Sequence, residues 1–139
     1  MLSGIATSVL IDAEIAHECL RSVPNYQEPA LRLLNSLRTY LEFQSTKEIL
    51  KEPPKGWLFP SVDIDYGLDA IEKKVEAEEY ESEYAFQIDI VTLLSSAKDG
   101  HLAWNGDLMG AFTFVRRVGN GLAAISSDGE STPLIYHVG

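Results

Sequence analysis

The sequence predicts an α+β domain, in which an amino-terminal helical bundle of about four helices precedes a small antiparallel β-sheet or hairpins. Two observations predict this class. Apolar residues recur at helical spacing through residues 12–98, and short β-branched and aromatic runs separated by turn signals fill residues 102–138. A chain of 139 residues is long enough to bury one core, so residues 1–139 are expected to form a single domain.

The first two expected helices cover residues 12–22 and 28–44, and residues 45–50 are expected to add a turn or a short helix. Pro24 ends the first helix, and Pro29 lies near the first turn of the second. The second helix is among the clearest in the chain because its apolar residues repeat at three- and four-residue steps: Ala30, Leu31, Leu34, Leu37 and Leu41.

A proline-rich segment, KEPPKGWLFPSVD at residues 51–63, follows these helices and predicts a long ordered loop. Trp57 and Phe59 are expected to pin this loop. The next expected helix, residues 66–79, has a narrow apolar stripe and many charges, which indicate a surface helix packed along one edge. The acidic cluster at residues 72–83 is interpreted as a solvated helix face with the turn after it.

The central helix is expected over residues 82–98, with apolar residues on most sides. Such a helix is buried. Ser82 is a plausible N-cap, Lys98 is expected in the last turn, and Gly100 is placed where a left-handed residue would end the helix. His101 therefore lies shortly after the end of a rigid helix.

Four short strands are expected after this helix, at residues 102–104, 111–118, 122–127 and 133–138. GNGLAA at residues 119–124 matches a loose dinucleotide-binding pattern in letters. It lies between two expected strands and opens no helix, so it is interpreted as a hairpin turn.

The composition excludes several classes of function. The 11 basic and 21 acidic residues give a net charge of -10, which disfavours nucleic acid and anionic membranes as partners. Cys19 is the only cysteine, so no internal disulfide can form. The opening MLSGIATSVLI has no basic residue before its apolar run and is not interpreted as a signal peptide, and no run reaches the roughly 18 apolar residues of a membrane span.

Enzyme motifs for nucleophile elbows, zinc proteases and phosphate-binding loops are absent. Asp99, His101 and His137 have side chains that suit zinc or iron, but their spacing matches no known zinc type, so no metal and no cofactor is predicted. His17 is expected on the polar side of the first helix. His101 differs from the other histidines because it follows a sharp helix end.

Several sequence blocks together resemble the amino-terminal region of fungal serine peptidases related to the tail-specific, or C-terminal processing, proteases. The similarity is greatest to the branch that contains tricorn and the chlamydial protease-like activity factor, and it covers nearly everything from about residue 16 onward. The blocks are LRSVP, SLRTYLEFQSTKEILKEPPKGWLFPSVDI, EYESEYAFQIDI, SSAKDGHLAW and AISSDGESTPLIYHV.

The resemblance implies a division of labour within a secreted peptidase that cuts polypeptides. A helical region precedes a PDZ-like segment and an α/β catalytic domain with the serine nucleophile, and these domains are the implied partners. By resemblance, His101 is the catalytic base, since a serine hydroxyl needs an imidazole to accept its proton. Asp99 is a candidate to orient the ring and stabilise the imidazolium.

This chain departs from the family pattern at both ends. It stops at Gly139, where related chains enter the PDZ-like segment, and it lacks the secretion signal and the upstream cysteine that relatives tend to have. The leading hypothesis is an amino-terminal domain or fragment of a peptidase-like protein, inactive alone. The alternatives are a noncatalytic protein-interaction module and, more weakly, a metal-dependent enzyme.

Overall fold

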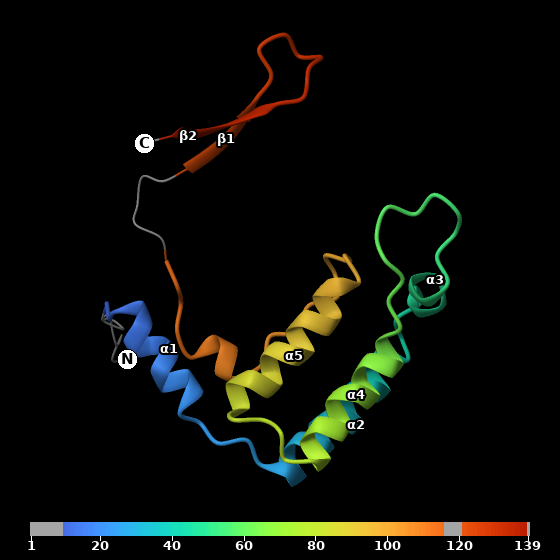
Figure 1. Ribbon diagram of the computed structural model, residues 1–139, viewed down its shortest axis with the longest axis vertical. Helices are drawn as coiled ribbons and strands as arrows, with labels where there is room; N and C mark the ends of the chain where they lie inside the picture. The colour runs from blue at the N-terminus through green and yellow to red at the C-terminus, as the bar shows by residue number, and fades with distance from the viewer. Residues whose placement is uncertain (1–9, 116–120, 139) are drawn as a thin grey trace, which may run out of the picture.

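The computed structural model describes residues 10–115 and 121–138, and in these residues helices come first and strands last (Figure 1). The predicted α+β class is therefore confirmed. The helices are α1 (Ala13–Arg21), α2 (Gln27–Leu41), α3 (Lys47–Lys51), α4 (Ile64–Glu76) and α5 (Glu83–Ser96), followed by the short 3-10 helix η1 (Leu108–Gly110). The strands are β1 (Gly121–Ile125) and β2 (Leu134–Val138).

The hydrophobic core lies among α2, α4 and α5, whose apolar stripes meet. α4 packs against both of the other helices. Leu34 of α2, Leu68 of α4, and Phe86 and Ile90 of α5 are completely buried. Each such side chain contributes about 1.5–3 kcal/mol by leaving water, which makes this three-helix unit the main source of stability.

Side-chain caps fix where three of the helices begin. The carboxylate of Asp12 accepts from the Glu14 N–H at 2.8 Å, that of Asp63 from the Tyr66 N–H at 3.0 Å, and the Ser82 hydroxyl from the Ala85 N–H at 3.2 Å. The Ser82 cap was predicted. The Asp63 cap was not, and it explains why α4 begins two residues before the predicted start at residue 66.

α5 occupies the central position that the sequence predicted. Phe86, Ile90 and Leu94 are buried in the core, and α1 and η1 also contact this helix. The His17 ring of α1 meets the Tyr84 ring of α5 edge-on, with centroids 5.2 Å apart. α5 is thus packed on more than one side, as its apolar composition requires.

The end of α5 differs from the prediction. The helix ends at Ser96, and Lys98 lies beyond it with a left-handed φ of 55°, whereas Gly100 is not left-handed. The Ser96 hydroxyl donates to the Leu93 carbonyl at 2.6 Å, and the Lys98 N–H donates to the Ser95 carbonyl at 3.2 Å. These bonds satisfy last-turn carbonyls before Gly100 is reached.

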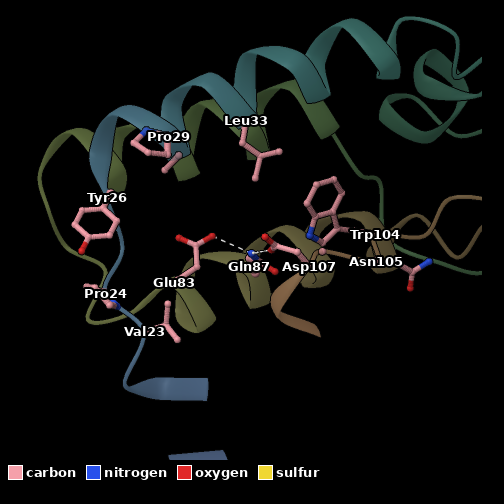
Figure 2. Close-up of a pocket in the computed structure, with 12 residues that line it drawn as sticks. Val23, Pro24, Tyr26, Pro29, Leu33, Glu83, Gln87, Trp104, Asn105 and Asp107 are labelled. Atoms are coloured by element: carbon pink, nitrogen blue, oxygen red, sulfur yellow. Dashed lines mark hydrogen bonds between the residues drawn. The ribbon is translucent and has the colours of Figure 1, made fainter. Parts of the chain in front are cut away.

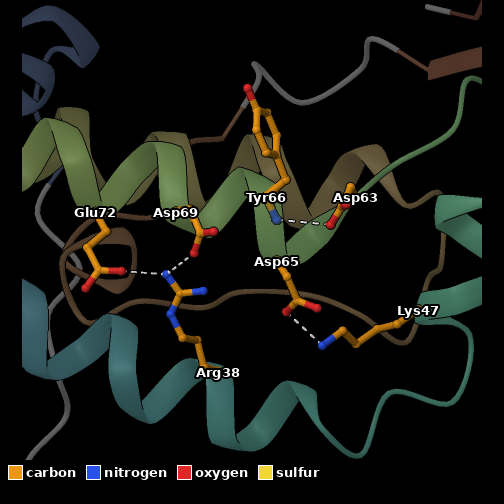
Figure 3. Close-up of polar contacts among 7 residues, drawn as sticks. All are labelled: Arg38, Lys47, Asp63, Asp65, Tyr66, Asp69 and Glu72. Carbon is orange, nitrogen blue, oxygen red and sulfur yellow. Dashed lines mark hydrogen bonds and ion pairs between the residues drawn. The ribbon is translucent and has the colours of Figure 1, made fainter.

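Ion pairs join α4 to α2 and to α3 (Figure 3). Arg38 Nη2 lies 2.8 Å from an Asp69 oxygen and 2.6 Å from a Glu72 oxygen, and Lys47 Nζ lies 2.8 Å from Asp65. The acidic cluster at residues 72–83 is largely exposed, as expected. Glu72 is nevertheless held by Arg38, so part of the cluster clamps two helices together.

The proline-rich loop is closed at its base but is not pinned by its aromatic residues. Trp57 is 44% exposed and Phe59 47% exposed, so the predicted pinning is wrong. The Val62 N–H instead donates to the Leu50 carbonyl at 2.7 Å, where the loop returns to α3. The loop therefore presents its aromatic side chains to the surroundings.

The strand predictions are only half correct. β1 and β2 pair antiparallel, with Gly121 opposite Val138 and Ile125 opposite Leu134. Residues 102–104 and 111–115 form no strand, and residues 116–118 and the predicted turn residues 119 and 120 lie outside the described part. Residues 102–104 fail as a strand because their apolar side chains pack against the helical core: Leu102 and Trp104.

The β1–β2 hairpin extends away from the helices (Figure 1). Every residue of β2 is exposed. None of the helices in the described part of the chain has the length and apolar character needed to cross a membrane. The helices therefore carry the buried core, and the candidate sites lie around α5.

Candidate functional site

The predicted pair Asp99 and His101 lies just after the end of α5. The Asp99 Oδ1 atom accepts a hydrogen bond from the His101 backbone N–H at 2.9 Å and lies 3.4 Å from the His101 Nδ1 atom. The imidazole is fully exposed, whereas the Asp99 carboxylate is only 26% exposed. The His101 imidazole is thus open to solvent, whereas the Asp99 carboxylate beside it is held by a hydrogen bond.

Gln44, which follows α2, anchors the second oxygen of Asp99. Its Nε2 atom donates to Asp99 Oδ2 at 3.0 Å and to the Thr46 hydroxyl at 2.6 Å. No sequence pattern predicts a role for Gln44. Gln44 lies 55 positions before Asp99, and only the packing of α2 and α5 in one core brings the two together.

The electrostatics of the pair follow from these bonds. The His101 backbone N–H lowers the pKa of Asp99 most, and the Gln44 amide lowers it further, while desolvation works in the opposite direction. Asp99 is therefore ionised at neutral pH. A carboxylate beside Nδ1 favours the tautomer with the proton on Nδ1, which leaves Nε2 as the basic nitrogen.

The structure separates the three histidines. His17 lies on α1 and contacts Tyr84 of α5, and His137 lies on β2 opposite Leu122. Within residues 10–115 and 121–138, no group of three or more His, Cys, Asp or Glu residues is placed to hold a metal ion. Asp99, His101 and His137 are therefore not brought together as a metal site in these residues. Cys19 is an exposed free thiol.

A cavity of about 510 Å3 lies beside the first half of α5, and we name it the Gln87 cavity (Figure 2). Its walls come from residues 23–33, from Glu83 and Gln87 of α5, and from residues 104–107. Gln87 is only 2% exposed. The cavity was not predicted, although the sequence contains a signal for it: Gln87 stands three residues before Ile90 and seven before Leu94, on the buried face of an apolar helix.

The polar groups of Gln87 are unequally satisfied. Its Nε2 atom donates to Glu83 Oε1 and to Asp107 Oδ1, each at 2.9 Å. In the described part of the chain, its Oε1 atom and the nearby Trp104 Nε1 atom are buried without a hydrogen-bond partner. A buried acceptor and a buried donor thus remain available.

Comparison with known proteins gives two relatives from one fungus. Over 85 residues the chain is 35% identical to the peptidase S41 family protein phomP1' of Diaporthe leptostromiformis, and 34% identical to the peptidase S41 family protein phomP1 of the same organism. This chain resembles part of a peptidase S41 family protein. No family model and no solved structure matches it.

The region of similarity covers most of this chain but only a small part of each relative. The matched residues make up 61% of this chain but only 12% of either relative. The resemblance to fungal serine peptidases that the sequence blocks indicated is thereby supported at the level of the peptidase S41 family. The chain corresponds to a small piece of proteins that are several times longer.

Proposed function

We propose that this chain is an amino-terminal part of a serine peptidase and that His101 supplies the general base to a serine on a separate catalytic domain. The observation that carries the proposal is the Asp99–His101 pair, in which an anchored carboxylate lies 3.4 Å from Nδ1 of a fully exposed imidazole. An exposed Nε2 can reach a hydroxyl on another domain. A serine hydroxyl becomes nucleophilic when such a base accepts its proton.

The proposal assigns separate roles to the two residues. His101 accepts the serine proton and later returns it to the leaving amine. Asp99 is a positioning residue that holds the ring and stabilises the imidazolium, and Gln44 holds Asp99 in turn. The proposal also assigns this chain to the tail-specific branch that contains tricorn, and it includes a PDZ-like segment as a further partner. The sequence blocks that resemble this branch support the assignment.

Two further observations support the division of labour. In the described part of the chain, the His101 ring contacts Asp99 and makes no hydrogen bond with a serine hydroxyl. The relatives extend far beyond the matched region, which makes up 12% of their length. The proposed partners are therefore the PDZ-like and catalytic domains of the parent peptidase, and the proposed substrate is a polypeptide.

The test uses a full-length peptidase that carries this segment. His101→Ala is expected to lower kcat on an unstructured polypeptide by about 10²–10⁴-fold, because proton transfer loses its base. Asp99→Asn should give a smaller loss, since a positioning residue costs less than the base. His17→Ala is the matched control, because its ring lies on α1 against Tyr84 in the first turn of α5, away from the Asp99–His101 pair that follows the other end of that helix, and it should retain activity.

Either of two results would contradict the proposal. Unchanged turnover in His101→Ala would favour a noncatalytic interaction module. Robust cleavage of casein by the 139-residue chain alone, abolished by His101→Ala, would show that the nucleophile lies within this chain and that the domain is active without partners.

A further inference from the structure

The β1–β2 hairpin, which extends away from the helices, has a continuous apolar face (Figure 1). Residues directly opposite each other in an antiparallel pair point to the same side of the sheet, and side chains alternate sides along each strand. One face, which we call the Tyr136 face, therefore contains six residues without a charged group: Gly121, Ala123, Ile125, Leu134, Tyr136 and Val138. Tyr136 is 47% exposed and Leu134 is 65% exposed. The large apolar side chains of this face are thus open to solvent.

The opposite face of the hairpin is apolar as well. It contains Leu122, Ala124 and Ile135 beside His137, and both Leu122 and Ile135 are largely exposed. Antiparallel sheets with one solvated face show alternating apolar and polar residues, whereas strands that are buried on both faces are apolar throughout. β1 and β2 follow the second pattern. The hairpin therefore has the composition of strands that lie inside a larger structure.

The outer edges of the hairpin are unprotected. Among the described residues, β1 and β2 pair only with each other, so each has an edge whose backbone groups face no strand there. Exposed edges are usually guarded against pairing by lysine, by proline or by a bulge. Neither strand contains a charged residue or a proline. β2 is the better edge for pairing because Ile135, Tyr136 and Val138 are strong strand formers, whereas β1 is mostly glycine and alanine.

The turn between the strands holds the hairpin ready for such a partner. The Asp128 Oδ1 atom accepts hydrogen bonds from the backbone N–H groups of Glu130 and Ser131, at 3.0 and 2.8 Å, and from the Ser126 and Ser131 hydroxyls, at 2.9 and 2.7 Å. The turn thus aligns the strands and lowers the entropy cost of adding a third one. A hairpin of two strands is only marginally stable in water, and a further strand with a covered face stabilises it.

Charge and length decide which partner fits. A second copy of this chain is disfavoured, because each copy has a net charge of -10 and a face-to-face pair would leave the other apolar face of each hairpin uncovered. The matched region is only 12% of either relative, so a peptidase of this kind has most of its residues outside the region. A strand from that remaining part is held nearby by the covalent chain, which favours its pairing over that of a separate molecule.

We propose that, in the parent peptidase, an uncharged apolar β-strand from outside this chain pairs with the free edge of β2, and that the Tyr136 face packs against the domain that supplies this strand. The hairpin then belongs to a larger sheet, and main-chain hydrogen bonds join the helical region to the rest of the peptidase. The inference rests on the proposed function only in taking the chain to be part of a longer peptidase. It requires no role for His101.

Hydrogen–deuterium exchange, measured by mass spectrometry, compares the 139-residue chain with a full-length peptidase that carries it. Peptides that cover residues 134–138 should exchange about 100-fold more slowly in the full-length protein, because alternate β2 amides gain a strand partner and the sheet opens less often. Peptides from α5 are the internal reference and should differ far less, because Phe86 and Ile90 are already buried by this chain's own core. Equal exchange of β2 in the two proteins would overturn the proposal.

Tyr136→Lys locates the contact. It places a charge on a face that the proposal buries, so it should speed β2 exchange in the full-length protein by at least about tenfold. Tyr40→Lys is the matched control, because Tyr40 is an exposed tyrosine of α2, and it should leave β2 exchange unchanged. Equal effects of the two substitutions would contradict the assignment of the Tyr136 face. The comparison of the two unsubstituted proteins keeps the proposal testable even if Tyr136→Lys fails to fold.

Sedimentation velocity of the 139-residue chain tests the alternative partner, a second copy. The chain should remain monomeric at about 0.15 M salt, because its net charge opposes association. A dimer that Tyr136→Lys dissociates would overturn the proposal and assign the face to self-association. These experiments measure backbone exchange and mass rather than cleavage, so they can fail while His101→Ala still abolishes turnover, and the reverse also holds.

Discussion

At the scale of single residues, the structure shows that Asp99 and His101 lie close together and that Gln44 holds Asp99 in place. The closeness of Asp99 and His101 was predictable, because residues two positions apart at a turn are within reach of each other. The role of Gln44 was not predictable, because it depends on how α2 and α5 pack. The sequence predicts Gln87 as a polar residue on a buried helix face. It does not predict that Gln87 donates hydrogen bonds to both Glu83 and Asp107.

The position that ends α5 gives a direct prediction at this scale. Lys98 holds a left-handed φ of 55°, which costs a residue with a Cβ about 1–2 kcal/mol. Lys98→Gly should therefore raise the free energy of unfolding by about 0.5–1 kcal/mol after the greater flexibility of unfolded glycine is counted. Urea denaturation of the 139-residue chain measures the change.

Gly100→Ala provides the matched control. A Cβ atom at Gly100 meets nothing within 4 Å and needs no left-handed backbone, so this variant should be neutral or slightly more stable. If Gly100→Ala were destabilising while Lys98→Gly changed nothing, the helix would end at Gly100 as the sequence suggested.

At the scale of elements, helical periodicity was a better guide than strand composition. The apolar stripe with Leu34 predicted the buried face of α2, and the stripe with Leu68 predicted that of α4, because helix burial follows a local repeat. The run at residues 102–104 has the composition of a strand but no partner strand. Its apolar side chains are stabilised more by packing on the helical core than by lying in an isolated strand. Local composition alone does not predict which of these two arrangements forms.

The α4–α5 connection predicts how stability responds to alkaline pH. The Tyr80 hydroxyl donates to Asp89 Oδ2 at 2.8 Å, and burial followed by this bond raises the pKa of Tyr80 well above its ordinary 10.0. The folded protein therefore keeps a proton that the unfolded chain loses. The stabilisation is complete below pH 10 and declines as the pH rises through the folded-state pKa.

Tyr80→Phe should remove this alkaline dependence and lower the free energy of unfolding at neutral pH by about 1 kcal/mol, because one hydrogen bond is lost. Urea denaturation between pH 8 and about 11 measures both effects. Tyr40→Phe, at a side chain that is 77% exposed, should retain the alkaline decline of the parent chain. An unchanged profile in Tyr80→Phe would contradict the assignment.

At the scale of the whole molecule, the helical core supports sites that face outward. α5 positions the Gln87 cavity beside its first half and the Asp99–His101 pair beyond its end. The hairpin adds an exposed apolar surface: Leu122, Ile125, Leu134, Ile135, Tyr136 and Val138. A surface of this kind is typical of contact with another domain, which accords with similarity to a small part of much longer peptidases.

The proposed activation of a serine on another domain by His101 can be measured by the rate at which a fluorophosphonate probe labels that serine in a full-length peptidase carrying this segment. The probe reports nucleophile activation without requiring substrate binding. We predict that His101→Ala lowers the labelling rate constant by about 10²–10⁴-fold while His17→Ala and His137→Ala leave it unchanged. Equal labelling of the parent protein and His101→Ala would show that His101 does not activate the serine.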